Sequence, residues 1–103
     1  MKYKIIYTTA PDKEAKEISK NLLEEKLIAC SNIFSISSIY KWEGEIKEEK
    51  EAGMVLKTKE ELTDKVIKRI KELHSYDVPE ILIINIEKGN DKYLKWIKEV
   101  TND

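Results

Sequence analysis

The segment from Ala29 to Lys59 constrains the fold more than any other part of this 103-residue chain. It holds two long runs rich in β-branched and aromatic residues, joined through the turn signal Trp42-Glu43-Gly44-Glu45. At about 3.3 Å per residue, the run from Ala29 to Trp42 reaches about 45 Å, whereas a compact domain of this length is about 33 Å across. We therefore expect a β-hairpin that extends beyond its own domain and whose unpaired edges are covered by another chain.

Two further strands are predicted outside the hairpin. Tyr3 to Thr8 reads as one strand, and Ile81 to Ile86 is a nearly continuous apolar run, which is typical of a strand buried on both faces. Within the hairpin, the alternation of apolar and polar residues slips between Ile36 and Ile39. This slip predicts a β-bulge at Ser37-Ser38.

Apolar residues at helical spacing predict two amphipathic helices and a short third one near the end of the chain. The first has Asp12 as its predicted N-cap and ends near Lys26. The second runs to about Leu73 behind Thr58-Lys-Glu-Glu61, which matches a capping box.

The order of these elements indicates the fold class. Strand, helix, strand, strand, helix and strand is the order of the split βαβ, or ferredoxin-like, α+β fold. Its sheet is antiparallel, and both helices pack on one face. The length allows one core, so residues 1–103 are predicted to form a single domain.

Charge and composition bound the partners and the location. Lys and Arg number 19 and Asp and Glu number 20, and this balance favours neither nucleic acid nor an anionic membrane as a partner. No stretch resembles a signal peptide or approaches the roughly 20 apolar residues of a membrane span. A single cysteine, Cys30, suits a reducing compartment, so we expect a cytoplasmic protein.

Few residues in this chain can carry chemistry. His74 is the one histidine, and the sequence has no nucleophile elbow, phosphate loop or HExxH motif, so we expect no enzymatic activity. Cys30, His74 and Glu80 are candidate ligands for copper or zinc if folding brings them together. Cys30 also has an interpretation as a small buried side chain, and His74 as a partner for backbone carbonyls. Lys57 is the candidate for binding an anion.

Six segments together resemble the CutA family of divalent-ion tolerance proteins. They occur in the family's order along the whole chain, and Y-x-W-E-G, L-K-T and H-x-Y-x-V-P-E are specific in combination. The segments are Thr8–Asp12, Leu27–Ile33, Ser38–Gly44, Met54–Thr58, His74–Ile81 and Tyr93–Ile97. The resemblance implies a ferredoxin-like subunit in a homotrimer, with the long hairpins pairing between subunits.

The resemblance also implies a function. The family is linked to tolerance of copper and other divalent cations, which implies a non-enzymatic, cation-binding homotrimer that needs no metal to fold. A second possibility is a PII-like module that holds a small anionic ligand between subunits, near Lys57, Tyr76 and Trp42. A third is a stable scaffold for partner proteins.

The family's metal site carries over only in part. A bacterial member uses a cysteine and a histidine pair, and those positions hold Thr8, Leu73 and His74 in this chain. Only His74 matches. Cys30 and Glu80 remain as weaker candidates beside it.

Overall fold

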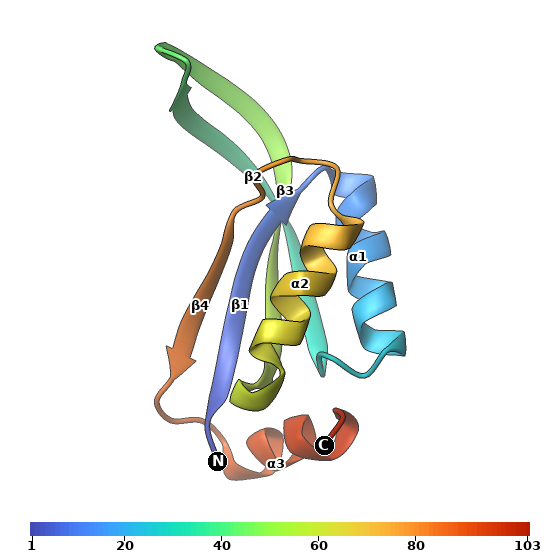
Figure 1. The fold of residues 1–103 in the computed structure, drawn as a ribbon. Coiled ribbons are helices and arrows are strands. Elements are labelled where there is room, and N and C mark those ends of the chain that lie inside the picture. The colour runs from blue at the N-terminus through green and yellow to red at the C-terminus, as the bar shows by residue number, and fades with distance from the viewer.

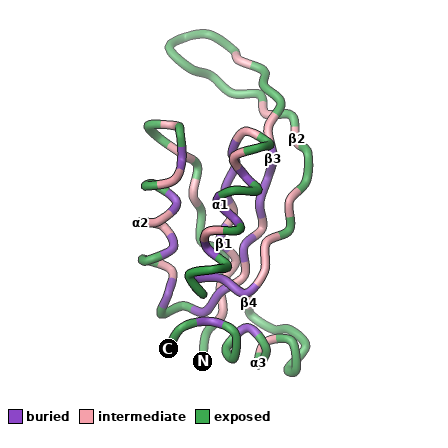
Figure 2. The backbone as a smooth tube through the Cα atoms, turned by 90° about the vertical axis from the view of Figure 1, so that its right-hand side faces the viewer, coloured by how far each residue is buried: buried purple, intermediate pink, exposed green.

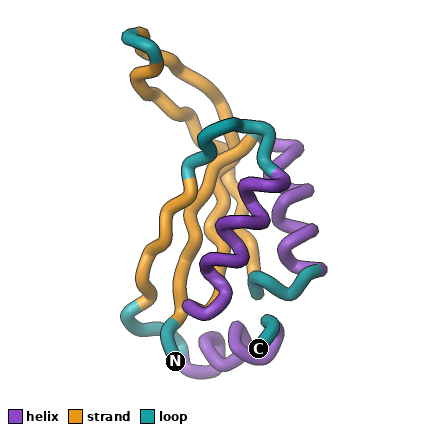
Figure 3. Tube along the Cα trace, in the orientation of Figure 1, coloured by secondary structure: helices purple, strands orange, loops and turns teal.

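The chain folds into an antiparallel sheet with helices on one face, in a computed structural model that describes residues 1–103. Its elements are β1 (Tyr3–Ala10), α1 (Asp12–Glu24), β2 (Cys30–Trp42), β3 (Glu45–Lys59), η1 (Glu60–Leu62), α2 (Thr63–Leu73), β4 (Ile81–Ile86) and α3 (Asp91–Val100). The strand order is β2-β3-β1-β4, which confirms the predicted ferredoxin-like fold. α1 and α2 cover one face, and α3 lies at the end of the sheet near the N-terminus (Figures 1 and 3).

α1 and α2 present apolar stripes to the sheet. Ala15, Ile18 and Leu22 of α1 are buried at spacings of three and four residues, and Val66 and Ile70 of α2 follow the same rule. The remaining core residues are Ile6, Ala10, Leu27, Ile28, Ala52, Met54, Leu56 and Leu62. The core therefore lies between the two helices and the central strands, below the extended part of the hairpin.

The first helix starts where predicted, but its N-cap differs by one residue, and the capping box predicted for the second helix is wrong. Asp12 is the first helical residue, and Pro11 occupies the N-cap position with no side-chain cap. Proline suits the entry to a helix because its φ is fixed, and the helix dipole favours a carboxylate in the first turn. α2 begins only at Thr63, because Thr58 stays in β3 and its hydroxyl donates to the carbonyl of Leu27 at 2.7 Å.

The β2–β3 hairpin extends far beyond the rest of the sheet, as predicted (Figure 1). Its ladder is continuous over the whole of β2, whereas β1 pairs only with residues 52–59 of β3. Residues 36–51 therefore project as a two-stranded ribbon, the hairpin arm, and the long axis of the molecule reaches 45 Å. Glu43 and Gly44 form the turn with φ values of 50° and 81°, and two positive φ values are what a type I′ hairpin turn requires.

No bulge interrupts the arm, so the predicted bulge at Ser37-Ser38 is wrong. These two serines pair in an unbroken register with Lys50 and Glu49. The arm packs on no core of its own, so nothing forces its apolar residues onto one face. The slip in the sequence pattern simply leaves Ile36 and Ile39 on opposite faces.

The prediction that β4 is buried on both faces is also wrong. β4 is an edge strand that pairs only with β1. Leu82, Ile83 and Ile84 have exposed fractions of 52%, 40% and 47%. An apolar strand at an open edge is a surface that proteins normally cover with another chain.

Burial is concentrated where the helices meet the sheet. Figure 2 shows buried residues along β1, the adjoining part of β3 and the helices, whereas the hairpin arm is largely exposed along its length. No helix has the length and the apolar character that crossing a bilayer requires.

Candidate functional site

A broad cleft lies between the hairpin arm and the loop that connects α2 to β4. This loop passes the base of the arm (Figure 1). The cleft has a volume of about 850 Å³, within the range of small-molecule sites. Its aromatic walls are Tyr40, Trp42 and Tyr76.

The arm places its cleft side chains by strand alternation. In the antiparallel register, even-numbered residues of β2 share a face with odd-numbered residues of β3, so Tyr40 and Trp42 share a face with Glu49 and Glu51. The hydroxyl of Tyr40 donates to Oε1 of Glu49 at 2.7 Å. The hydroxyl of Tyr76, from the loop, donates to Oε1 of Glu51 at 3.0 Å. The second bond ties the loop to the arm.

His74 anchors the loop that carries Tyr76. Its side chain is fully buried, with Nε2 2.7 Å from the carbonyl oxygen of Thr9 and Nδ1 3.1 Å from the backbone nitrogen of Tyr76. A carbonyl only accepts and an N–H only donates, so Nε2 carries the proton and Nδ1 accepts. Glu14 also holds this loop, because its Oε1 accepts from the backbone N–H of Ser75 at 2.6 Å. A metal ion at either ring nitrogen would have to displace a hydrogen bond.

The cleft is acidic. Four carboxylates line it, and none of them forms a salt bridge; they belong to Glu49, Glu51, Asp77 and Glu80. The one basic lining residue, Lys47, pairs with Glu45 at 3.1 Å. The cleft therefore has an excess of negative charge that the chain itself does not neutralise.

Burial and the neighbouring carboxylates together raise the pKa values of three tyrosines near the cleft. Burial, with the hydrogen bond to Glu51 and its charge, raises the pKa of Tyr76 to about 12. The hydrogen bond to Glu49 is the largest of the effects that raise the pKa of Tyr40. The pKa of Tyr7 is raised by burial and then by two of the cleft carboxylates. At neutral pH these phenols therefore stay protonated and act as donors.

The structure brings some of the predicted site residues together. Trp42, Tyr76 and Glu80 all line the cleft, while His74 lies behind its wall and positions Tyr76. Cys30 is elsewhere, and no three His, Cys, Asp or Glu side chains are placed to hold one metal ion. The three predicted metal ligands thus form no common site within one chain.

Cys30 and Lys57 lie together at the other end of the sheet. They are cross-strand partners, and Nζ of Lys57 is 3.8 Å from Sγ of Cys30. Tyr93 of α3 is their neighbour, and its pKa is raised by burial and by the thiol of Cys30. Lys57 pairs with Ile5 of β1, about 13 Å along the strand from Thr9 at the cleft.

The sequence alone does not identify Glu49 and Glu51 as site residues, because charged residues at alternating positions of a strand are typical of a solvated face. The alternation of side chains along the two strands would have identified these glutamates as cleft residues. Once the turn is placed at Glu43-Gly44, counting back along both strands puts these two glutamates on the face that carries the cleft aromatics.

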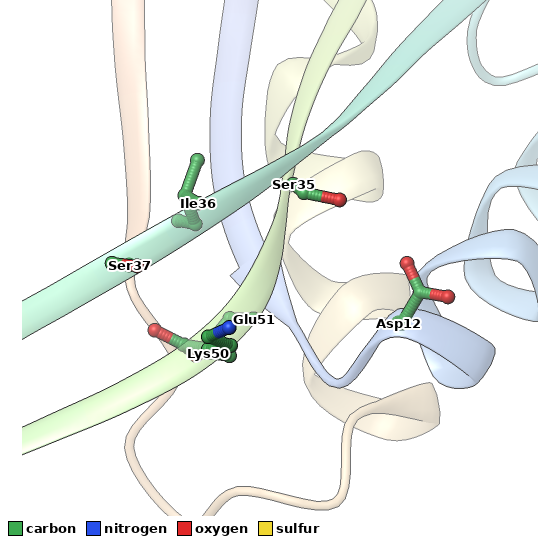
Figure 4. Close-up of a pocket in the computed structure, with 6 residues that line it drawn as sticks. All are labelled: Asp12, Ser35, Ile36, Ser37, Lys50 and Glu51. Atoms are coloured by element: carbon green, nitrogen blue, oxygen red, sulfur yellow. The ribbon is translucent and has the colours of Figure 1, made fainter.

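A smaller hollow of about 360 Å³ lies beside the start of α1 (Figure 4). It is lined by Asp12, Ser35, Ile36, Ser37, Lys50 and Glu51. Figure 4 shows Ser35 turned toward Asp12, with Ile36 on the other side of the strand. With a single apolar side chain it offers little surface to enclose a ligand, so the larger cleft is the candidate site.

The fold and the hairpin arm define a class of ferredoxin-like proteins with an overhanging hairpin. Residues 4–100 match the family described as CutA1 divalent ion tolerance protein, and the chain belongs to this family. It is 51% identical over 98 residues to the divalent-cation tolerance protein CutA of Pyrococcus horikoshii, covering 94% of this chain and 96% of that protein.

Solved structures agree with this assignment. The crystal structure of CutA1 from Oryza sativa superposes with a TM-score of 0.96 at 40% identity, covering all of this chain and 96% of that one. CutA from Archaeoglobus fulgidus superposes with a TM-score of 0.94 at 45% identity, covering 95% and 97% of the two chains. The Archaeoglobus protein is described as periplasmic, so the cytoplasmic location expected from the sequence stays a prediction.

Proposed function

We propose that this protein is a non-enzymatic, homotrimeric binding protein for divalent cations and that the acidic cleft is its site. One observation carries the proposal: four carboxylates line the cleft, and none is paired with a basic side chain. Copper is the cation we expect to bind most tightly, because Cu²⁺ exceeds the other first-row divalent ions in affinity for a given set of ligands. The divalent ion tolerance that describes the family agrees with this proposal.

The metal site we propose is shared between subunits. One chain offers no group of three ligands, so a closed site needs side chains from a neighbour. Glu80 is the predicted ligand with the best access, since it lines the cleft. His74 would first have to give up a hydrogen bond, and Cys30 lies at the other end of the sheet.

Two exposed apolar surfaces support the homotrimer. One is β4, where Leu82 and Ile84 are about half exposed. The other is the face of the arm opposite the cleft aromatics, where Ile46 has an exposed fraction of 76%. A two-stranded ribbon is only marginally stable alone, and the pairing of its edges with a neighbour would satisfy its unpaired backbone groups.

Calorimetric titration with Cu²⁺ tests the proposed site. We expect Glu80→Gln to lower the affinity about tenfold, because it removes a charged oxygen ligand without changing shape. Glu99→Gln is the matched control, since it removes the same charge from an exposed position on α3. Cys30→Ser and His74→Ala test the other two predicted ligands. Identical titrations of wild type and Glu80→Gln would contradict the proposal.

A second candidate function is that of a PII-like module that binds a small molecule in the same cleft. The specific observation in its favour is the combination of a volume of about 850 Å³ with three aromatic walls. A metal ion needs neither feature, whereas small-molecule sites usually have both.

A further inference from the structure

We propose that the cleft binds an aliphatic polyamine, an alkyl chain that carries two or more ammonium groups. This inference rests on the small-molecule function proposed for the cleft and names its ligand class. Lys57, the residue expected to attract an anion, lies outside the cleft. Lys47, the one basic lining residue, is already paired with Glu45. An anion would therefore meet four carboxylates and no free cation.

The aromatic walls offer an organic cation contacts that a hydrated metal ion does not use. Tyr40 and Trp42 stand on the arm with exposed fractions of 39% and 54%, and Tyr76 faces the same space from the loop. Ammonium groups are attracted to the faces of such rings, and methylene groups bury against them. Ile39 and Val78 add apolar surface to the same cleft.

The spacing of the carboxylates favours several charges over one. Glu49 and Glu51 are two residues apart on one face of β3, which separates them by about 6.6 Å. Asp77 and Glu80 stand on the loop, across from the arm. No three of these groups converge on a single point, as a metal ion would need. A flexible chain with ammonium groups separated by methylenes reaches carboxylates on both walls.

Two phenols hold the arm carboxylates in place before a ligand arrives. Tyr40 and Tyr76 each donate to the Oε1 atom of a glutamate and leave its Oε2 atom without a protein partner. Because the pKa of Tyr76 is about 12, its hydroxyl stays a donor at neutral pH. Carboxylates fixed in this way lose little freedom when a cation binds.

Calorimetric titration of the full chain with spermidine tests the inference. We expect saturable binding that weakens as salt is added. Glu49→Gln and Glu51→Gln should each lower the affinity about tenfold, since each removes one charge-assisted contact. Trp42→Leu should weaken binding about threefold or more through the lost ring face. Glu99→Gln should leave binding unchanged.

Comparison ligands test the number and the sign of the charges. Choline carries one ammonium group and should bind about tenfold or more weakly than spermidine, and citrate should not bind. Three results would each overturn the inference. They are spermidine binding that does not saturate, equal spermidine affinities of Glu49→Gln and Glu99→Gln, and choline binding as tight as that of spermidine. Melting curves and light scattering check that every variant folds and assembles as wild type. If Trp42→Leu does not fold or assemble, the isosteric Gln variants alone test the inference.

Cu²⁺ titrations of the same variants separate this inference from the proposed metal function. Trp42→Leu should weaken spermidine binding more than Cu²⁺ binding, because an indole ring offers no ligand to the metal. Cu²⁺ binding without spermidine binding would overturn the polyamine inference alone. If neither spermidine nor Cu²⁺ binds, the cleft is not a cation site.

Discussion

At the scale of single residues, His74 shows how a buried polar side chain can organise a site without touching a ligand. Its imidazole joins β1 to the following loop through Thr9 and Tyr76, and it uses both ring nitrogens to do so. The ring also packs against Tyr76, with centroids 4.6 Å apart. The interpretation of His74 as a partner for backbone carbonyls is therefore consistent with the structure, although the carbonyl belongs to a strand rather than to its own helix.

Tyr76 predicts a pH dependence of stability. Its pKa is about 12 in the folded chain against an ordinary value of 10.0, so folding favours the protonated phenol. That stabilisation is complete below pH 10 and is lost as the pH rises from about 10 to about 12. We expect the free energy of unfolding of wild type to fall across this window and that of Tyr76→Phe to fall less. Because the phenol is partly solvated, the difference should be modest.

Urea unfolding at a series of pH values measures this difference, and tyrosinate absorbance follows the phenol directly. At neutral pH the two proteins should respond to pH in the same way, which provides the control. Equal losses of stability in both proteins across the alkaline window would contradict the assignment.

At the scale of elements, the end of α1 carries a strained residue. Lys26 has a φ of 57°, and it follows the helix in a Schellman motif. The N–H of Leu27 donates to the carbonyl of Leu22, and that of Lys26 donates to the carbonyl of Leu23. Glycine normally occupies this left-handed position, because a side chain there costs about 1–2 kcal/mol.

Lys26→Gly should therefore stabilise the protein. Relief of the left-handed strain exceeds the added entropy of the unfolded chain, so we expect a gain of about 0.5–1 kcal/mol in the free energy of unfolding. Lys20→Gly, at an exposed position inside the same helix, should cost about 1 kcal/mol. Denaturant titrations of the two variants give both signs in one experiment, and destabilisation by Lys26→Gly would exclude the explanation.

The elements also show what the sequence could predict. Periodicity located each helix and strand, because the core side of α1, α2 and β1 demands apolar residues at fixed spacing. Periodicity gave a wrong prediction along the arm, where no core requires apolar residues to lie on one face of the strands. It also failed where a local motif competed with tertiary contacts, as at Thr58, whose hydroxyl bonds to Leu27 instead of capping a helix. The sequence predicted part of the cleft, namely Trp42 and Tyr76. Glu49 and Glu51 could not be assigned to it, because their position depends on the register of the hairpin.

At the scale of the whole molecule, the apolar surface lies on the side of the sheet that the helices leave open and on its β4 edge. Ile84 of β4 is 47% exposed and pairs with Ile5 of β1. In the proposed trimer this surface meets a neighbour, while the helices remain outside.

Ile84→Glu should therefore shift the protein from trimer toward monomer. A carboxylate buried between subunits loses its hydration and gains no partner. Leu23→Glu is the control, because Leu23 is an apolar residue of α1 with a similar exposed fraction of 41%. Light scattering should report three times 12.1 kDa for wild type and for Leu23→Glu, and a smaller mass for Ile84→Glu. A trimeric Ile84→Glu would place the interface elsewhere.

The hairpin arm has a consequence for how this chain opens. The two strands of the arm pair only with each other, so opening the arm breaks its own ladder and the Tyr76–Glu51 hydrogen bond and leaves the helix–sheet body intact. An isolated two-stranded ribbon is marginally stable in water, and its amide protons exchange quickly unless a neighbour protects them. Amide exchange along residues 36–51 thus reports, residue by residue, the fraction of time for which a neighbouring subunit covers each arm. The exchange rate of the hairpin therefore measures the assembly of the protein.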